Sequence, residues 1–166
     1  MIIQHRYRSP LGELMLASYG DALCMCDWTG SRKHASNSHR ISAGLAASFV
    51  EGTSPVIHEA VRQLEEYLHG SRQAFHIPLL LVGTPFQKAV WNTLLTIPFG
   101  TTVTYAEQAL RMNSPKAVRA VAQANGSNAI SIIVPCHRVI GANRQLTGYA
   151  GGLEAKHSLL KLEQIL

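Results

Sequence analysis

The stretch TYAEQALRMNSPKAVRAVAQANG at residues 104–126 reads as two short helices joined by a tight turn. Thr104 and Glu107 match a capping box, in which a hydroxyl and a carboxylate satisfy the first free amides of a helix reciprocally. Ser114 and Pro115 form a second helix-start signal, and that helix is expected to end near residue 126. The pattern predicts a helix-turn-helix, although helical hairpins are also common in proteins that never meet DNA.

The basic residues of the chain are concentrated in the half that contains this stretch. Residues 1–84 carry seven Lys/Arg and seven Asp/Glu, whereas residues 85–166 carry eight against three, so the whole net charge of +5 lies in the second half. Such a surface attracts polyanions, of which nucleic acid is the commonest. The charge by itself leaves a nucleic-acid partner and a merely solvated basic face equally open.

Downstream of the two helices, a cysteine follows an apolar run. Residues 130–134, apolar except for Ser131, are expected to form a buried strand that stops at Pro135, which holds the thiol of Cys136 at a defined exit. The neighbouring His137 and the cationic Arg138 favour the thiolate, which is the nucleophilic form. The run therefore predicts a reactive thiol, the alternative being an inert buried cysteine beside a surface His-Arg pair.

Upstream, the chain divides into strand-like and helical segments. Residues 2–28 read as strands joined by tight turns, and residues 29–53 show little periodicity and are expected to be a loop or a poorly ordered connection. Helices are expected to start at Ser54-Pro55 and at Thr84-Pro85, each with an apolar stripe that we interpret as core.

Length and composition are typical of a folded protein with one core or two small lobes. With 166 residues, 46% of them apolar and 15% charged, the chain is neither disordered nor rich in long apolar runs. No signal-peptide pattern is visible, and three cysteines without disulfide-framework spacing suit a reducing compartment, so the expected location is the cytoplasm. Cys24 and Cys26 are expected to be buried core residues rather than metal ligands.

Six segments of the second half resemble the O6-alkylguanine-DNA alkyltransferases, single-use repair proteins that move an alkyl group from guanine O6 to their own cysteine. They are TPFQKAVW at 84–91, IPFGTTVTY at 97–105, PKAVRAV at 115–121, ANGSN at 124–128, IVPCHRVIG at 133–141 and TGYAGGL at 147–153. The resemblance implies an α+β fold. A small N-terminal lobe over 1–83, ribonuclease H-like with antiparallel sheet plus helix, would precede a C-terminal winged helix-turn-helix lobe over 84–166.

The resemblance also implies the roles of the reactive centre. Cys136 is the alkyl acceptor, activated through His137, a water molecule and Glu163, whose carboxylate orients the imidazole and stabilises its charged form. Asn128 is expected to bond backbone on both sides of the turn before the cysteine. Tyr105 is expected to donate a hydrogen bond to the flipped base and so offset charge on the leaving guanine. No metal and no cofactor are expected, because the alkyl carbon goes directly to sulfur and leaves S-alkylcysteine.

Further positions are implied to hold double-stranded DNA that contains O6-alkylguanine or O4-alkylthymine. The base must leave the stack to be reached, and Arg119 is expected to enter the gap from the minor groove. The other expected contacts are a pocket wall at Tyr149, the Ala150 amide facing O6, the Cys136 and Val139 carbonyls receiving the exocyclic amine, a cation behind the pocket at Lys156, and DNA-binding positions at Ser114 and Ala117. The protein is expected to be a monomer without membrane contact.

Two alternatives and one expectation of specificity complete the analysis. A lesion-sensing DNA-binding protein of alkyltransferase-like type would use the same pocket without transfer, but such relatives carry a different residue in place of the cysteine. A cysteine hydrolase would need an oxyanion motif, and none is visible. Ser131 and Ala150 are small where other family members carry stiffer or larger residues, which predicts a wide pocket.

Overall fold

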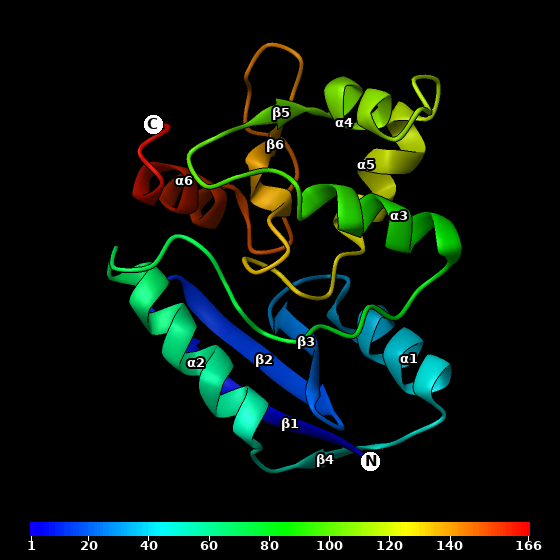
Figure 1. Ribbon diagram of the computed structural model, residues 1–166, viewed down its shortest axis with the longest axis vertical. Helices are drawn as coiled ribbons and strands as arrows, with labels where there is room; N and C mark the ends of the chain where they lie inside the picture. Colours follow the sequence, from blue (N-terminus) through cyan, green and yellow to red (C-terminus); the bar gives the residue numbers. More distant parts are fainter.

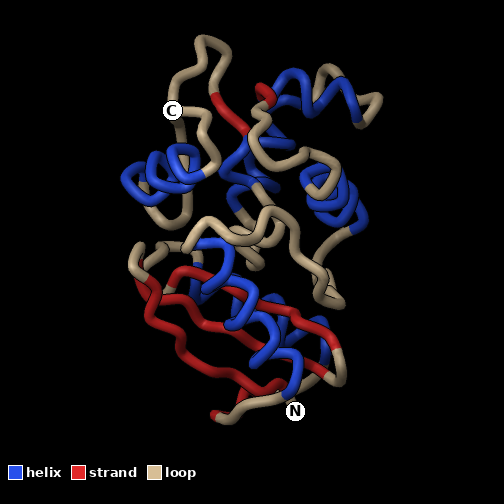
Figure 2. The backbone as a smooth tube through the Cα atoms, turned by 60° about the vertical axis from the view of Figure 1, so that its left-hand side comes forward, coloured by secondary structure: helices blue, strands red, loops and turns tan.

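The computed structural model describes all of residues 1–166, which form two lobes (Figure 1) that share one main core cluster. The elements of the N-terminal lobe are β1 (Ile2–Ser9), β2 (Gly12–Tyr19), β3 (Ala22–Trp28), α1 (His34–Leu45), β4 (Phe49–Glu51) and α2 (Pro55–Leu68). Those of the C-terminal lobe are α3 (Pro85–Leu94), β5 (Val103–Thr104), α4 (Tyr105–Arg111), α5 (Val118–Gly126), the 3-10 turn η1 (Cys136–Arg138), β6 (Val139–Ile140) and α6 (Leu153–Leu162). Figure 2 shows the longer strands gathered in one lobe, and the other lobe built almost wholly of helices and loops.

The sheet of the N-terminal lobe has the strand order β3-β2-β1-β4. The first three strands form an antiparallel meander, and β4 lies parallel to β1. Side chains alternate along β2, so Leu14 and Leu16 pack into the same cluster as α2, whereas Met15 and Ala17 pack with Ile41 of α1. The two helices therefore cover opposite faces of the sheet.

The strands predicted over residues 2–28 are present, and both cysteines of β3 are buried as predicted. Cys24 belongs to the cluster beneath α1, and Cys26 belongs to the larger cluster on the α2 side. Burial raises the pKa of the Cys24 thiol to about 12 and raises that of Cys26 further still. Both thiols therefore stay neutral and serve as small packing groups.

The prediction that residues 29–53 form a loop is wrong. The segment contains α1 and the short edge strand β4. The sequence did not predict α1 because no side chain caps its N-terminus, no acidic residue lies in its first turn, and one of its two buried residues is the polar Asn37. An apolar stripe was therefore absent from the sequence.

Three of the four expected helix starts are found where the sequence predicts them. Ser54 caps α2, and full capping boxes open α3 at Thr84 and α4 at Thr104. The start of the next helix at Ser114-Pro115 is wrong, because α5 begins at Val118. The Ser114 hydroxyl bonds back to the carbonyl of Met112 instead of capping α5, so residues 114–117 form a turn between the two helices.

The apolar run at residues 130–134 is buried, but it is not the expected strand. It makes a single bridge to the open edge of β3, with the amide of Cys26 donating to Ala129 and the amide of Ser131 donating to Cys26, each at 2.8 Å. Ile132 then adopts a left-handed conformation with φ of 71°, which turns the chain toward Cys136. The segment that carries the cysteine is thus docked on the N-terminal sheet.

The predicted fold class, an α+β protein with a sheet lobe followed by a helical lobe, is confirmed. The main core cluster contains residues from both lobes, among them Leu16, Leu64, Trp91 and Leu159. The lobes therefore stabilise each other. None of the helices combines the length and the apolar character that a bilayer crossing requires.

Candidate active site

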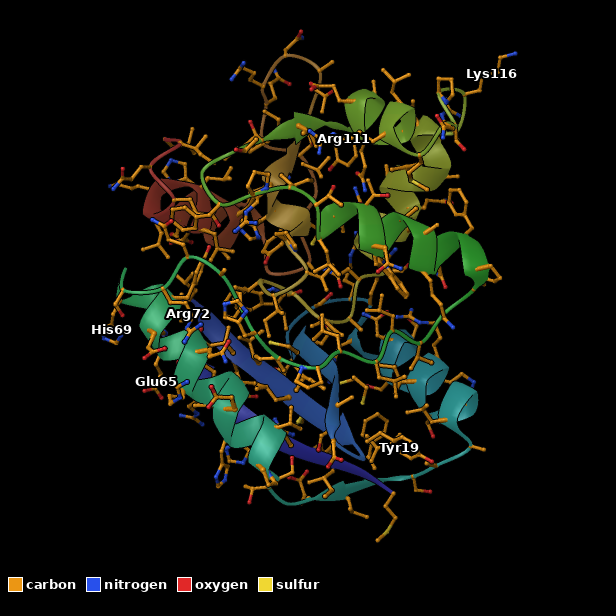
Figure 3. All side chains as sticks on the ribbon, in the orientation of Figure 1. Tyr19, Glu65, His69, Arg72, Arg111 and Lys116 are labelled. Carbon is orange, nitrogen blue, oxygen red and sulfur yellow. The ribbon has the colours of Figure 1, made fainter.

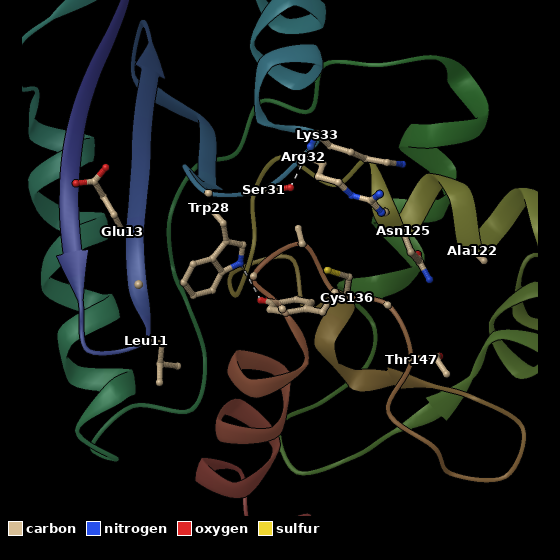
Figure 4. Close-up of a pocket in the computed structure, with 18 of the residues that line it drawn as sticks. Leu11, Glu13, Trp28, Ser31, Arg32, Lys33, Ala122, Asn125, Cys136 and Thr147 are labelled. Atoms are coloured by element: carbon tan, nitrogen blue, oxygen red, sulfur yellow. Dashed lines mark hydrogen bonds between the residues drawn. The ribbon is translucent and has the colours of Figure 1, made fainter.

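A cavity of about 730 Å³ lies where the two lobes meet, and Cys136 forms part of its wall (Figure 4). The N-terminal lobe contributes Trp28 and the turn at residues 30–33. The C-terminal lobe contributes Tyr105, one side of α5 and the loop at residues 147–152. Cavities of this size hold a molecule the size of a drug, and so also a nucleobase.

The Cys136 thiol is held by the turn that precedes it. The Asn128 amide nitrogen donates to the carbonyl of Val134 at 2.9 Å and lies 3.3 Å from the sulfur, while the Asn128 amide oxygen accepts from the amide of Ile130. Asn128 therefore bonds backbone on both sides of the turn. One buried side chain fixes the thiol and the turn together.

The environment of Cys136 leaves its thiol neutral at rest. Burial raises the pKa of this thiol, and the hydrogen bond from Asn128 and the charge of Lys156 offset only part of the effect. A base is therefore needed to generate the thiolate when the thiol reacts.

The neighbouring imidazole can serve as that base. His137 Nε2 lies 2.8 Å from Glu163 Oε2, and both side chains are buried. Because a carboxylate oxygen only accepts, Nε2 carries the hydrogen and Nδ1 keeps a free lone pair. Burial lowers the pKa of His137, and Nδ1 bonds to no other protein group. The ring is therefore neutral at rest and able to take a proton.

Glu163 accepts hydrogen bonds from several segments at once. Arg138 binds it through Nε and Nη2 at 2.9 and 3.0 Å, and the amide of Gly100 and the hydroxyl of Tyr67 add two more. Burial alone would raise the pKa of this carboxyl, but the donors from His137, Arg138 and Tyr67 lower it to about 2. Glu163 is therefore a carboxylate throughout the physiological range.

Two tyrosines border the cavity on the C-terminal side. The Tyr105 hydroxyl, at the first turn of α4, donates to the carbonyl of Thr147 at 3.3 Å. The Tyr149 hydroxyl accepts from the indole nitrogen of Trp28 at 3.3 Å, and the two rings meet edge to face. Burial raises the pKa of both phenols, so both remain hydrogen-bond donors. Ala150 lies beside Tyr149 in the same wall.

Lys156 lies behind this wall and is not part of it. Its buried ammonium donates to the carbonyls of Val139 and Thr147, each at 2.7 Å, and approaches that of Gly148. Burial lowers the pKa of Lys156 to about 8, and the proximity of Cys136 works in the opposite direction. Lys156 thus joins the loop at residues 147–152 to β6 by hydrogen bonds. The carbonyl of Val139 already accepts one of these bonds.

The remaining expected positions lie away from the cavity. Arg119 is exposed on the first turn of α5, and Ser114 and Ala117 lie in the turn before it. Figure 3 shows Lys116 of this turn projecting away from the body of the lobe, and Arg111, at the end of α4, is exposed as well. The structure thus brings Cys136 and its neighbours together and separates them from a basic outer surface.

Ser131 contradicts one expectation of the sequence. Its side chain is fully buried, its hydroxyl has no protein partner, and it is not among the residues that line the cavity. The predicted widening of the pocket at this position is therefore wrong. Ala150 does lie in the wall, as expected.

Three residues of the site were missed by sequence reasoning. Trp28 and Tyr67 come from the N-terminal lobe, where each looks like an ordinary core aromatic, and Arg138 was expected to be a neighbouring charge and not a ligand of Glu163. Only contacts between distant segments reveal them, since Trp28 and Tyr67 bond to residues of the C-terminal lobe and Arg138 bonds to Glu163 within it.

Comparisons with known proteins identify the class to which this fold and site belong. Residues 2–81 match the family described as 6-O-methylguanine DNA methyltransferase, ribonuclease-like domain, and residues 85–165 match 6-O-methylguanine DNA methyltransferase, DNA binding domain. The chain belongs to the 6-O-methylguanine DNA methyltransferase family.

Full-length relatives agree with this assignment. The methylated-DNA–protein-cysteine methyltransferase of Methanosarcina acetivorans is 46% identical over 95% of each chain. The constitutive one of Bacillus subtilis is 44% identical over 95% of this chain and 92% of its own. Among solved structures, Mycobacterium tuberculosis OGT in complex with DNA matches with a TM-score of 0.84 and 42% identity, covering 98% of this chain and 92% of that one.

Proposed function

We propose that this protein repairs alkylated DNA by taking the alkyl group from O6 of guanine onto the sulfur of Cys136. Family membership supports DNA binding and transfer to cysteine. The observation that carries the proposal is the geometry at the cavity wall, where a neutral thiol held by Asn128 is followed directly by the buried His137–Glu163 pair. The full-length relatives do not favour the lesion-sensing alternative.

The chemistry is one displacement. The thiol proton passes to Nδ1 of His137, through a water molecule as the family resemblance implies, and Glu163 stabilises the imidazolium that forms. The sulfur then attacks the alkyl carbon, the carbon–sulfur bond forms as the carbon–O6 bond breaks, and the electron pair leaves with the guanine. Tyr105 is proposed to donate a hydrogen bond that offsets this charge. The thioether is stable, so each molecule reacts once.

The proposed DNA contacts fall on two parts of the protein, the exposed end of α4 and α5 and the cavity at Cys136. The exposed basic end of α4 and α5 is proposed to bind the duplex, with Ser114 and Ala117 near the phosphates and Arg119 filling the space that the flipped base leaves. Tyr149, the Ala150 amide and the Cys136 and Val139 carbonyls are proposed to surround the base, with Lys156 acting from behind by holding their loop. O4-alkylthymine is proposed as a second substrate.

The boundary between the two functional parts is proposed at residues 83 and 84, with the sheet lobe as a support for the DNA-binding lobe. The protein is proposed to act as a monomer in the cytoplasm. One chain supplies the whole cavity, and all three cysteines are free thiols, which suits a reducing compartment.

Intact-protein mass spectrometry after incubation with a duplex containing O6-methylguanine tests the proposal. The wild-type protein should gain one methyl group per chain, located on the Cys136 peptide, and should stop after one turnover. Cys136→Ala should gain none and still bind DNA, while the matched control Cys24→Ala should react like the wild type. Methylation elsewhere, or repeated turnover, would refute the single-use mechanism.

The same measurement with two substrates tests base flipping. Arg119→Ala should slow reaction with duplex DNA far more than reaction with free O6-benzylguanine, which needs no extrusion. Lys161→Ala, an exposed cation on α6, is the control and should leave both rates unchanged. Equal slowing with both substrates would assign Arg119 to the pocket or the fold instead.

A further inference from the structure

Tyr67 joins the N-terminal lobe to the carboxylate of the reactive centre. It lies near the end of α2, is fully buried, and donates from its hydroxyl to Glu163 Oε2 at 2.5 Å across 96 residues of sequence. Its ring packs against Phe75 and Phe99, with centroids 5.3 and 6.3 Å away. The ring is therefore part of the core, and only the hydroxyl touches the reactive centre.

The hydroxyl is not needed to hold the carboxylate in place. Glu163 Oε1 accepts from Arg138 Nε at 2.9 Å and from the amide of Gly100 at 3.1 Å, and Arg138 Nη2 reaches Oε2 at 3.0 Å. A paired, planar guanidinium and a backbone amide already define the position of the group. What the hydroxyl of Tyr67 changes is the negative charge that remains on Oε2.

That oxygen is the one that faces the imidazole. Oε2 is shared by Tyr67, Arg138 and His137 Nε2, which lies at 2.8 Å. Each donor that draws charge from Oε2 weakens its attraction for an imidazolium and so lowers the basicity of His137. The other charged or titratable groups around the ring are Arg138, Lys156 and the phenol of Tyr149, and both cations also disfavour the imidazolium.

We propose that Tyr67 acts through Glu163 to limit the basicity of His137, and thereby restrains the reactivity of Cys136. This inference rests on the proposed function only in taking Cys136 as the group that reacts. A protein that reacts only once is inactivated permanently if its thiolate is alkylated by an electrophile other than its substrate. A weakly basic imidazole keeps the thiol protonated, and therefore unreactive, until a base occupies the cavity.

Tyr67→Phe removes the hydroxyl and keeps the ring. The rate of alkylation of Cys136 by iodoacetamide, followed on the Cys136 peptide across pH, should rise about threefold near neutral pH, which corresponds to about half a pKa unit on His137. At low pH, where the imidazole is protonated in both proteins, the two rates should converge. Tyr7→Phe is the matched control, since Tyr7 packs against the same core cluster and its hydroxyl bonds to no other group. It should leave the pH profile unchanged.

A change in the opposite direction separates tuning from folding. Site-specific 3-fluorotyrosine at position 67 keeps the ring and the hydrogen bond but makes the hydroxyl a stronger donor, so the neutral-pH rate should fall below that of the wild type. Thermal unfolding of all variants records any loss of fold. An unchanged or uniformly scaled pH profile in both Tyr67 variants would overturn the proposal and leave Tyr67 as a packing residue.

The readout with iodoacetamide needs no DNA, so the two proposals fail independently. If the wild type transferred no methyl group from DNA but its Cys136 responded to both Tyr67 variants as expected, the proposed function would be wrong and the role of Tyr67 would stand. If transfer from DNA occurred and the profiles did not move, only the role of Tyr67 would be refuted.

Discussion

Two carboxylates, one in each lobe, are almost completely withdrawn from solvent and yet have opposite environments. Glu163 is 2% exposed, and both of its oxygens accept hydrogen bonds from several donors. Asp27, at the end of β3, is 0% exposed, and only its Oδ2 is bonded, to His34 at 2.9 Å and to Asn37 at 3.2 Å. Its Oδ1 has no protein partner.

The direction in which the pKa of each carboxyl is shifted depends on how many hydrogen-bond donors it has, and not on how deeply it is buried. Donors lower the pKa of Glu163 to about 2 in spite of its burial, whereas burial raises the pKa of Asp27 because its two donors do not compensate. A buried charge is thus stabilised at the reactive centre and only partly stabilised in the N-terminal lobe. Of the two buried carboxylates, the one at the reactive centre therefore receives more hydrogen bonds.

The Asp27 cluster nevertheless reaches the reactive segment. Asn37 donates to Asp27 and accepts a hydrogen bond from Arg40. The Arg40 guanidinium also donates to the carbonyl of Val82 at 3.0 Å and to that of Ser127 at 2.9 Å. Ser127 directly precedes Asn128, which holds the thiol. The same guanidinium lies 5.2 Å from the centre of the Trp91 ring. The Glu163 cluster is thus the one proposed to activate the cysteine, and the Asp27 cluster, through Arg40, bonds the residue that precedes Asn128.

The largest effect is expected from Glu163→Gln. The amide group would turn one oxygen into a donor that faces the donors of Arg138, Tyr67 and His137, and it would leave Arg138 without its counter-charge. Breaking one half of a buried ion pair lowers the free energy of unfolding by about 3–5 kcal/mol. Urea unfolding at pH 7 should show that loss, and methyl transfer to Cys136 should be lost with it.

The pH dependence of stability supplies a second readout for Glu163. Because its pKa is lowered on folding from about 4.5 to about 2, the stability it provides is complete above the higher value and is lost as the pH falls toward the lower one. Glu163→Gln should flatten the stability curve over this acid range. Glu66→Gln, a partly exposed carboxylate on α2 paired with Arg62 and Arg72, should change stability little at any pH. Equal behaviour of the two variants would contradict the comparison.

A smaller effect is expected from Arg40→Met, which keeps a long side chain and removes the guanidinium. The carbonyls of Val82 and Ser127 lose their donor, and the free energy of unfolding should fall by about 1–3 kcal/mol. Methyl transfer should be slowed but not abolished, because Asn128 keeps its own contacts. Arg62→Met is the exposed control and should preserve both stability and rate. Loss of transfer as complete as in Glu163→Gln would place Arg40 in the activating cluster.

Sequence reasoning found the parts of this comparison that depend on local signals. The capping boxes at Thr84 and Thr104 each involve residues three apart, and their helices were predicted correctly. The run around Cys136 is compact as well, and so the thiol and the imidazole were singled out from it, whereas the Asn128 turn was expected from the family resemblance. Glu163 was found only through the family resemblance, because a single carboxylate near the end of the chain carries no local signal.

What the sequence did not reveal depends on contacts between distant segments. The helix α1 buries Asn37 because Asp27 receives it, so the polar residue interrupts the apolar pattern that would have predicted a helix. Tyr67 has the spacing of a core residue, and its second role exists only because Glu163 arrives from the other end of the chain. The start of α5 was misplaced because the Ser114 hydroxyl has a competing local partner.

The smallest effect is expected from Asp27→Asn, the change that removes the less stabilised charge. The amide oxygen can accept from His34 and Asn37 as Oδ2 does, and the amide nitrogen takes the place of Oδ1, which has no partner to lose. The relief of a buried charge and the loss of the pairing with His34 oppose each other. The free energy of unfolding at pH 7 should therefore stay within about 1 kcal/mol of the wild type.

The sign of the pH dependence distinguishes Asp27 from Glu163. Since folding raises the pKa of Asp27 above 3.8, the native state holds this proton more tightly, and ionisation of Asp27 costs stability as the pH rises through that range. The stability of Asp27→Asn relative to the wild type should therefore increase as urea unfolding is repeated from pH 4 toward pH 7. Asp21→Asn, in the exposed turn between β2 and β3, controls for the loss of one negative charge. A relative stability that decreased with pH would mean that Asp27 is held as a stabilised anion after all, and the contrast between the two lobes would disappear.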